Sequence, residues 1–263
     1  MRRSIAIMAV LTLAAGACGD DDGGDGGGPT GEEAAGEEAS AACDAWVAAT
    51  QAIDIDEDLE AGILALEDFV AAAPDDVASA VEPVIPLLQD DPEVALESDE
   101  AVAAANAADE WSLGNCGDVR LDVEAVNFAF AGIPPEIEAG RVVFNLTNQT
   151  QTDEFHEALL LRKDDGVTET AHDTLAAGLG GPLSVDTALA ALEPFELVGG
   201  ALVEPDGGDS QDAFVVDLEP GEYIVVCLLH ADSPELIEAY FAGEEVEGIR
   251  HFDHGMFAEL TVS

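Results

Sequence analysis

The spacing of apolar residues along the chain indicates two folded regions of different kinds. Between about residues 40 and 117, apolar side chains recur at intervals of three and four, as in Leu59, Ile63, Leu66 and Val70. This is the period of a helix with one buried face. Prolines interrupt the pattern, so we expect a small bundle of about four short helices.

The pattern between residues 118 and 263 favours β-strands. Short β-branched and apolar runs, such as residues 119–125 and 141–147, are separated by glycine and proline turn signals. About six or seven such runs predict a β-sandwich or a partly open barrel. Residues 164–212 interrupt the pattern with an alanine- and leucine-rich stretch, so we expect an insertion there, either a surface elaboration or a lid over one end of the sandwich. The sequence thus predicts an α+β protein of two domains.

Two further segments precede the folded regions. Residues 1–17 begin with Arg2 and Arg3 and continue with small and apolar residues, as in a removable export signal that is too short to span a bilayer. The run LAAGAC ending at Cys18 resembles a bacterial lipobox, which implies a lipid anchor on Cys18. Residues 18–39 are rich in glycine and acidic side chains and predict an extended tether. We therefore expect a protein at the outer face of the cytoplasmic membrane, or otherwise in the periplasm or outside the cell.

The charge of the chain excludes several classes of partner. The 263 residues include 57 Asp and Glu against 7 Lys and Arg, which gives a formal net charge of −50. A protein this acidic has too few basic side chains to neutralise phosphates. We therefore expect no nucleic-acid partner and no membrane contact except through the lipid anchor. Hydrophobic residues make up 48% of the chain, enough to exclude disorder throughout.

The four cysteines suggest different roles. In an exported protein, Cys43 near the start of the helical region and Cys116 at its end are expected to form a disulfide. If Cys18 carries lipid, Cys227 is the thiol left over, and a free thiol in an oxidising compartment favours a metal ligand.

Two segments near the C-terminus resemble the plastocyanin-like cupredoxins. They are residues 218–227 (LEPGEYIVVC) and residues 251–256 (HFDHGM), followed by a final strand. In that family a PGxYxxxC strand supplies a thiolate, a loop supplies a His and a Met, and an earlier strand supplies another His. The resemblance implies a Greek-key β-sandwich with a type 1 copper site, in which His156, Cys227 and His251 are equatorial ligands and Met256 is the axial ligand.

The donor set suits copper, and one ligand position has an alternative. Two imidazoles and a thiolate accept both Cu(I) and Cu(II), and a weak axial thioether tunes the potential. His230 follows Cys227 by three residues, which is also a spacing of the family, so His230 is the alternative to His251. A site of three histidines (His156, His230 and His251) holding another metal is a further possibility.

The resemblance implies a function without catalytic turnover. We expect a lipid-anchored protein that binds one copper ion and transfers single electrons, or carries copper, between partner proteins that the sequence does not identify. The alternative is a metal-free β-sandwich of the cell envelope that acts as a binding or interaction module and docks a partner through its acidic helical domain.

Overall fold

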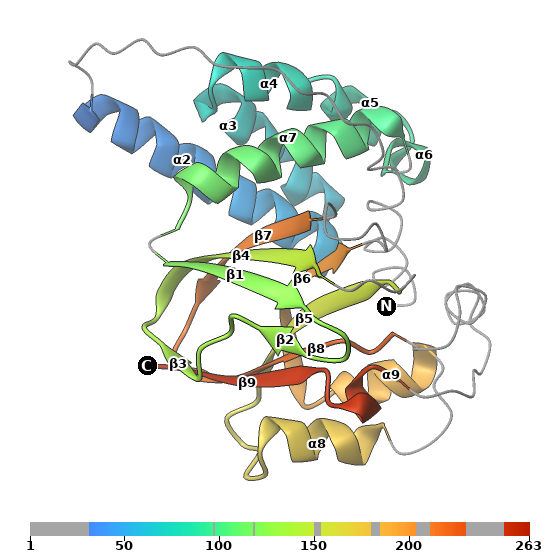
Figure 1. The fold of residues 1–263 in the computed structure, drawn as a ribbon. Coiled ribbons are helices and arrows are strands. Elements are labelled where there is room, and N and C mark those ends of the chain that lie inside the picture. The colour runs from blue at the N-terminus through green and yellow to red at the C-terminus, as the bar shows by residue number, and fades with distance from the viewer. Residues whose placement is uncertain are drawn as a thin grey trace.

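The protein consists of a helical domain followed by a two-sheet β-sandwich, as the computed structural model shows (Figure 1). This confirms the predicted fold class. The structure describes residues 32–96, 98–117, 119–149, 154–179, 185–203, 211–229 and 250–263. The predicted signal peptide and Cys18 lie outside the described residues. Within the part of the chain that the structure describes, no helix has the length and apolar character needed to cross a membrane.

The helical domain packs around an aromatic centre. Its elements are α2 (Glu32–Thr50), the π-helix η1 (Gln51–Ile55), α3 (Leu59–Ala72), α4 (Asp75–Val81), α5 (Val84–Asp90), α6 (Pro92–Leu96) and α7 (Asp99–Asn115). The ring of Phe69 lies 5.1 Å from that of Trp46 and 5.7 Å from that of Trp111, which brings α2, α3 and α7 together. Side chains of Asp58 and Ser98 accept backbone N–H groups at the starts of α3 and α7.

Two differences from the prediction have simple causes. The bundle has more helices than expected, because the prolines divide its middle into the short helices α4, α5 and α6. Helix α2 begins at Glu32 and so extends into the predicted tether, where the sequence EEAAGEEA is rich in the strong helix formers alanine and glutamate.

The sandwich is made of one four-stranded and one five-stranded sheet. The first has the order β2 (Phe130–Ala131), β1 (Val119–Ala125), β4 (Gly140–Asn148) and β7 (Gln211–Leu218). The second has the order β3 (Glu136–Ile137), β9 (Phe257–Val262), β8 (Gly221–Val226), β5 (His156–Lys163) and β6 (Phe195–Val203). Inward side chains from both sheets form one apolar core, which includes Phe144, Leu160 and Val225.

The predicted insertion proves to be part of the sandwich and of its cover. Helices α8 (Ala171–Gly178) and α9 (Val185–Leu192) pack with Leu161 and Ile224 on the outer face of the five-stranded sheet (Figure 1). The insertion is thus an elaboration of that face. It also contains strand β6, in which Gly199 is needed because a Cβ there would lie 2.5 Å from Cδ2 of Phe214.

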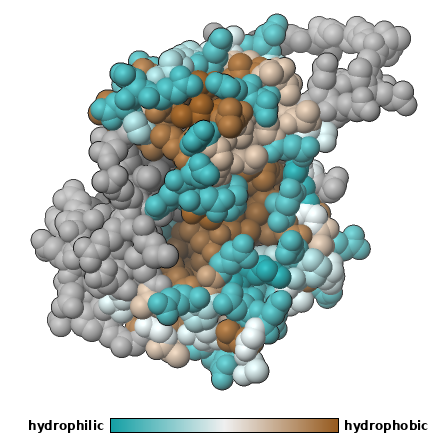
Figure 2. Space-filling model, turned by 180° about the vertical axis from the view of Figure 1, so that it is seen from behind, coloured by the Kyte–Doolittle hydropathy of each residue, from teal (hydrophilic) through white to brown (hydrophobic). Residues whose placement is uncertain are grey.

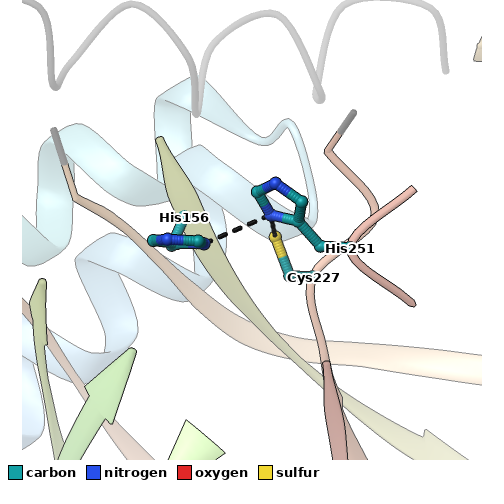
Figure 3. A group of neighbouring side chains, drawn as sticks. All are labelled: His156, Cys227 and His251. Carbon is teal, nitrogen blue, oxygen red and sulfur yellow. Dashed lines mark hydrogen bonds between the residues drawn. The ribbon is translucent and has the colours of Figure 1, made fainter. Parts of the chain in front are cut away.

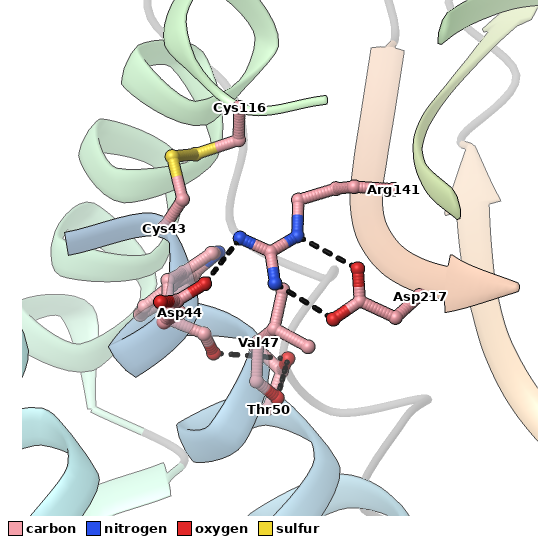
Figure 4. A network of polar contacts seen from close by, with 8 residues as sticks. Cys43, Asp44, Val47, Thr50, Cys116, Arg141 and Asp217 are labelled. Atoms are coloured by element: carbon pink, nitrogen blue, oxygen red, sulfur yellow. Dashed lines mark hydrogen bonds and ion pairs between the residues drawn. A yellow bond between two sulfur atoms is a disulfide. The ribbon is translucent and has the colours of Figure 1, made fainter. Parts of the chain in front are cut away.

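The helical domain covers the outer face of the four-stranded sheet. The predicted disulfide between Cys43 and Cys116 is present and is buried against Val143 and Val215 of the sandwich. Beside it, Arg141 of β4 donates to Asp44 of α2 and, through two hydrogen bonds, to Asp217 of β7 (Figure 4). The two domains therefore meet at one place, where the disulfide of the helical domain packs against apolar side chains of the sandwich beside an ion-pair network.

Candidate metal centre

Three of the predicted ligands meet at one end of the sandwich. His156 is the first residue of β5, and Cys227 directly follows β8, the neighbouring antiparallel strand. His251 immediately precedes the 3₁₀-helix η2 (Phe252–His254), which leads into β9. Because β5 pairs with β8 and β8 with β9, the ends of adjacent strands carry all three side chains to the same point (Figure 3).

The donor atoms of these side chains face one another. The Nδ1 atom of His251 lies 3.2 Å from Nδ1 of His156 and 3.2 Å from Sγ of Cys227 (Figure 3). All three residues have no exposed surface. Among the described residues, this is the one group of three or more His, Cys, Asp or Glu whose ligand atoms all lie within 4.8 Å of one another.

Backbone hydrogen bonds tie the ligand loop to the cysteine segment. The N–H of His251 donates to the carbonyl of Leu229 at 2.8 Å, and the N–H of Cys227 donates to the carbonyl of Met256 at 3.2 Å. Met256 in turn donates to the carbonyl of His251, and Gly255 closes this tight loop with a φ of 99°, where a side chain would be strained. The segment from His251 to Met256 is thereby held against the residues that follow β8.

Two further residues, Met256 and His230, are predicted ligands or alternatives. Met256 is fully buried in the same core cluster as Cys227, and its backbone bonds to both Cys227 and His251. Its role as axial ligand stays a prediction. His230 lies outside the described residues, so the structure brings together the set that contains His251 and does not test His230.

Burial shifts the pKa values of two of the candidate ligands, His156 and Cys227. Removal from water lowers the pKa of His156 to about 4, so its imidazole is neutral at pH 7. Burial raises the pKa of the Cys227 thiol well above its usual value, and the nearby carboxylate of Glu157 acts in the same direction. The thiol is therefore protonated when no metal is bound, and metal coordination would release that proton.

Glu157 and Phe128 are neighbours of the site that the sequence analysis did not single out. The backbone N–H of Glu157 lies 3.4 Å from Sγ of Cys227, and its carboxylate accepts the N–H of Leu228 at 2.8 Å. The ring of Phe128 lies 5.2 Å from that of His251 and stacks on exposed His254 at 4.4 Å. Glu157 directly follows the predicted ligand His156, and this position in the sequence could have identified it as a neighbour of the site. No sequence pattern connects Phe128 to the site.

The donor set fits copper. Two imidazole nitrogens and one sulfur form a trigonal set of the kind found in blue-copper sites. Ligand atoms placed around a metal at roughly 2.0–2.3 Å lie about 3.5 Å apart. The observed separations of 3.2 Å are close to that value. The site therefore needs little rearrangement to enclose an ion.

Comparisons with known proteins gave matches among solved structures only. No protein-family model matches the chain. No curated protein sequence matches it either. Auracyanin B is 20% identical, with a TM-score of 0.33, over 56% of this chain and 89% of its own. Auracyanin A of Chloroflexus aurantiacus, described as a "blue" copper protein, is 19% identical, with a TM-score of 0.32, over 56% of this chain and 100% of its own. Rusticyanin of Thiobacillus ferrooxidans is 18% identical, with a TM-score of 0.31, over 56% of this chain and 79% of its own.

Proposed function

We propose that this protein is a cupredoxin that binds one copper ion and transfers single electrons between partner proteins. The observation that carries the proposal is the convergence of His156, Cys227 and His251, whose donor atoms face one another in a fully buried site. Met256 is the proposed axial ligand, because its backbone forms hydrogen bonds with the backbones of Cys227 and His251. When bound, copper supplies one-electron redox chemistry through its Cu(I) and Cu(II) states.

The contribution of the protein is a rigid and dry donor set. The ligands lie at the ends of paired strands and on a loop held by backbone hydrogen bonds, so their positions change little between the two charge states of the site. The N–H of Glu157 that points at Cys227 Sγ stabilises negative charge on that sulfur. The ring of Phe128 lies 5.2 Å from that of His251, whose side chain has no exposed surface.

We infer in addition that the protein is exported and held at the outer face of the cytoplasmic membrane through Cys18. The support for Cys18 is its lipobox-like sequence alone. Export itself has a second support, because a disulfide such as Cys43–Cys116 persists in oxidising compartments. Electron transfer would then occur with redox proteins of the cell envelope.

The test is a Cu(II) titration of the whole chain, followed by visible absorption and EPR. We expect an intense thiolate-to-copper charge-transfer band and a narrow copper hyperfine splitting at one equivalent. Cys227→Ser should lose the band, whereas the control His172→Ala, at a partly exposed histidine of α8 that does not belong to the cluster, should keep it. A colourless wild-type protein would favour a metal-free interaction module instead. A band that survives Cys227→Ser would exclude this ligand set.

The same titration decides the second imidazole ligand. His251→Ala should abolish the band and His230→Ala should leave it, because His251 already lies 3.2 Å from both other donors. The reverse result would assign the position to His230.

A further inference from the structure

A second site of a different kind lies between the two domains. A cavity of about 590 Å³ extends from helices α2, η1 and α7 to strands β6 and β7. From behind, the molecule shows an apolar hollow between its helical and sheet layers, interrupted by hydrophilic side chains (Figure 2). Cavities of roughly 300–1,000 Å³ with apolar walls and a few polar groups are the usual sites of small organic ligands.

Six carboxylates line this cavity, and three of them, from three different elements, form no ion pair with a basic side chain of the described residues. We call these three the junction carboxylates: Asp54 of η1, Asp109 of α7 and Asp212 of β7. The N–H groups of Leu202 and Ala213 donate to Asp212, each at 2.8 Å. Trp46 donates its indole N–H to Asp109 at 3.2 Å, and among the described residues no hydrogen bond or ion pair reaches the carboxylate of Asp54.

Among the described residues that line the cavity only Arg162 is basic, and it pairs with other acidic side chains. No ion pair of the described residues involves any of the three, and Arg162, which also lines the cavity, is engaged by Glu196 and Glu219. Burial, with the charge of Asp212 adding to it, raises the pKa of Asp54 to about 7, and burial raises the pKa of Asp212 to about 6. All three side chains remain partly exposed, and a cation bound beside them would favour their ionised forms.

The geometry argues against a metal ion as the partner. The junction carboxylates are not among the groups whose ligand atoms lie within 4.8 Å of one another, a condition that only the His156, Cys227 and His251 cluster meets among the described residues. Apolar side chains, including Leu88, Leu197 and Phe214, line much of the cavity. A ligand that contacts several of these carboxylates must therefore have an apolar body as well as positive charge.

We propose that the cavity between the domains binds an organic cation with an apolar body, such as an alkyl quaternary ammonium compound. The positive head lies among Asp54, Asp109 and Asp212, and the apolar part contacts the β6 and β7 side of the cavity. Trp46 adds an aromatic ring beside the carboxylates, which favours a quaternary ammonium group. This site is independent of copper binding, because none of its residues belongs to the metal centre.

The experiment is isothermal titration calorimetry of the full chain with three probes of equal chain length: octyltrimethylammonium, octanol and octanoate. We expect saturable one-to-one binding of the cation, weaker binding of octanol and no binding of octanoate. Asp54→Asn with Asp212→Asn should weaken binding of octyltrimethylammonium at least tenfold and leave octanol unchanged. Ala105→Leu, which adds volume inside the cavity, should weaken both.

A charge-matched control separates the cavity from the general acidity of the protein. Glu60→Gln with Asp68→Asn removes the same two charges from exposed positions of α3 that do not line the cavity, and it should change the affinity less than twofold. Equal weakening in both double variants would overturn the proposal, because the attraction would then come from net charge alone. Binding of octanoate as tight as that of the cation, or no binding of the cation at millimolar concentration, would overturn it as well.

Discussion

The protein contains two clusters of ionisable side chains, one fully buried and one partly exposed, and they differ in donor type and in spacing. At the end of the sandwich, the His–Cys–His cluster (His156, Cys227 and His251) places nitrogen and sulfur donors together, with Nδ1 of His251 3.2 Å from both other donor atoms. At the domain junction, the carboxylates are hard donors set farther apart around a cavity of about 590 Å³. One cluster encloses space for a single ion, and the other borders space for a molecule.

The difference comes from how each cluster is built. Adjacent strands with fixed register carry the His–Cys–His cluster, so hydrogen bonding within one sheet sets its geometry. Elements of two domains carry the junction carboxylates, so the docking of the helical domain on the four-stranded sheet sets theirs. Changes at the domain contact should therefore alter the second cluster and leave the first intact.

The strongest test of this independence is removal of the disulfide. Cys43→Ala with Cys116→Ala opens a link that spans 73 residues of sequence. In the chain-entropy model the free energy of unfolding falls by about 4 kcal/mol, measured by urea denaturation. The copper charge-transfer band of the folded variant should not change. Loss of that band under folding conditions would show that the two regions are coupled.

Copper itself should stabilise the protein only through the His–Cys–His cluster. At a free copper concentration 100 times the dissociation constant, linkage adds about 2.7 kcal/mol to the free energy of unfolding. His156→Ala should lose this gain, whereas Asp54→Asn should keep it. Thermal or urea unfolding with and without copper measures both. A gain that persists in His156→Ala would place the ion elsewhere.

The third test uses the pKa of Asp54. Because its folded pKa is raised from 3.8 to about 7, the folded state holds more protons than the unfolded state between these values, and its stability falls as pH rises through that window. Asp54→Asn removes this loss. Three pKa units correspond to about 4 kcal/mol, and because the Asp54 side chain is partly exposed we expect about half of this. The variant should therefore be about 2 kcal/mol more stable than wild type at pH 8 and nearly equal to it at pH 4.

Urea denaturation across this pH range checks the prediction for Asp54. The control Asp68→Asn, at an exposed position of α3, should stay within about 0.5 kcal/mol of wild type at every pH. Equal stability of Asp54→Asn and wild type at pH 8 would mean that the carboxylate is well solvated in the cavity.

The sequence predicted the fold and the three residues of the His–Cys–His cluster because both depend on local patterns. Helical and strand periods are properties of short windows, and the motif around Cys227 and His251 places residues on one strand and one loop. Strand β6 escaped prediction because Gly199 and Gly200 resemble a loop, although Gly199 is required by close packing on Phe214. Tertiary packing overrode the local signal there.

The cavity could not be predicted, because its members are unremarkable in sequence. Asp54, Asp109 and Asp212 are three of 57 acidic residues, and each belongs to a different element. Only the docking of the two domains distinguishes them from solvated carboxylates. The same holds for Phe128, which reaches His251 through the fold alone.

The smallest expected effect concerns the ion-pair network at the domain contact. Arg141 keeps 20% of its side-chain surface exposed and bridges Asp44 and Asp217, which fix α2 to β7 (Figure 4). Arg141→Met should lower the free energy of unfolding by about 1 kcal/mol, near the upper end for a partly exposed pair, because one guanidinium serves two carboxylates. Arg120 pairs with Asp122 inside strand β1 and both are exposed, so Arg120→Met should cost about 0.5 kcal/mol or less. Urea midpoints distinguish the two variants. An equal loss of stability in both would assign Arg141 no special part in the docking of the domains.

The Arg141→Met variant also tests whether the domain contact controls the cavity. If it weakens binding of octyltrimethylammonium while the copper spectrum stays constant, docking of the domains controls the cavity and not the candidate metal centre.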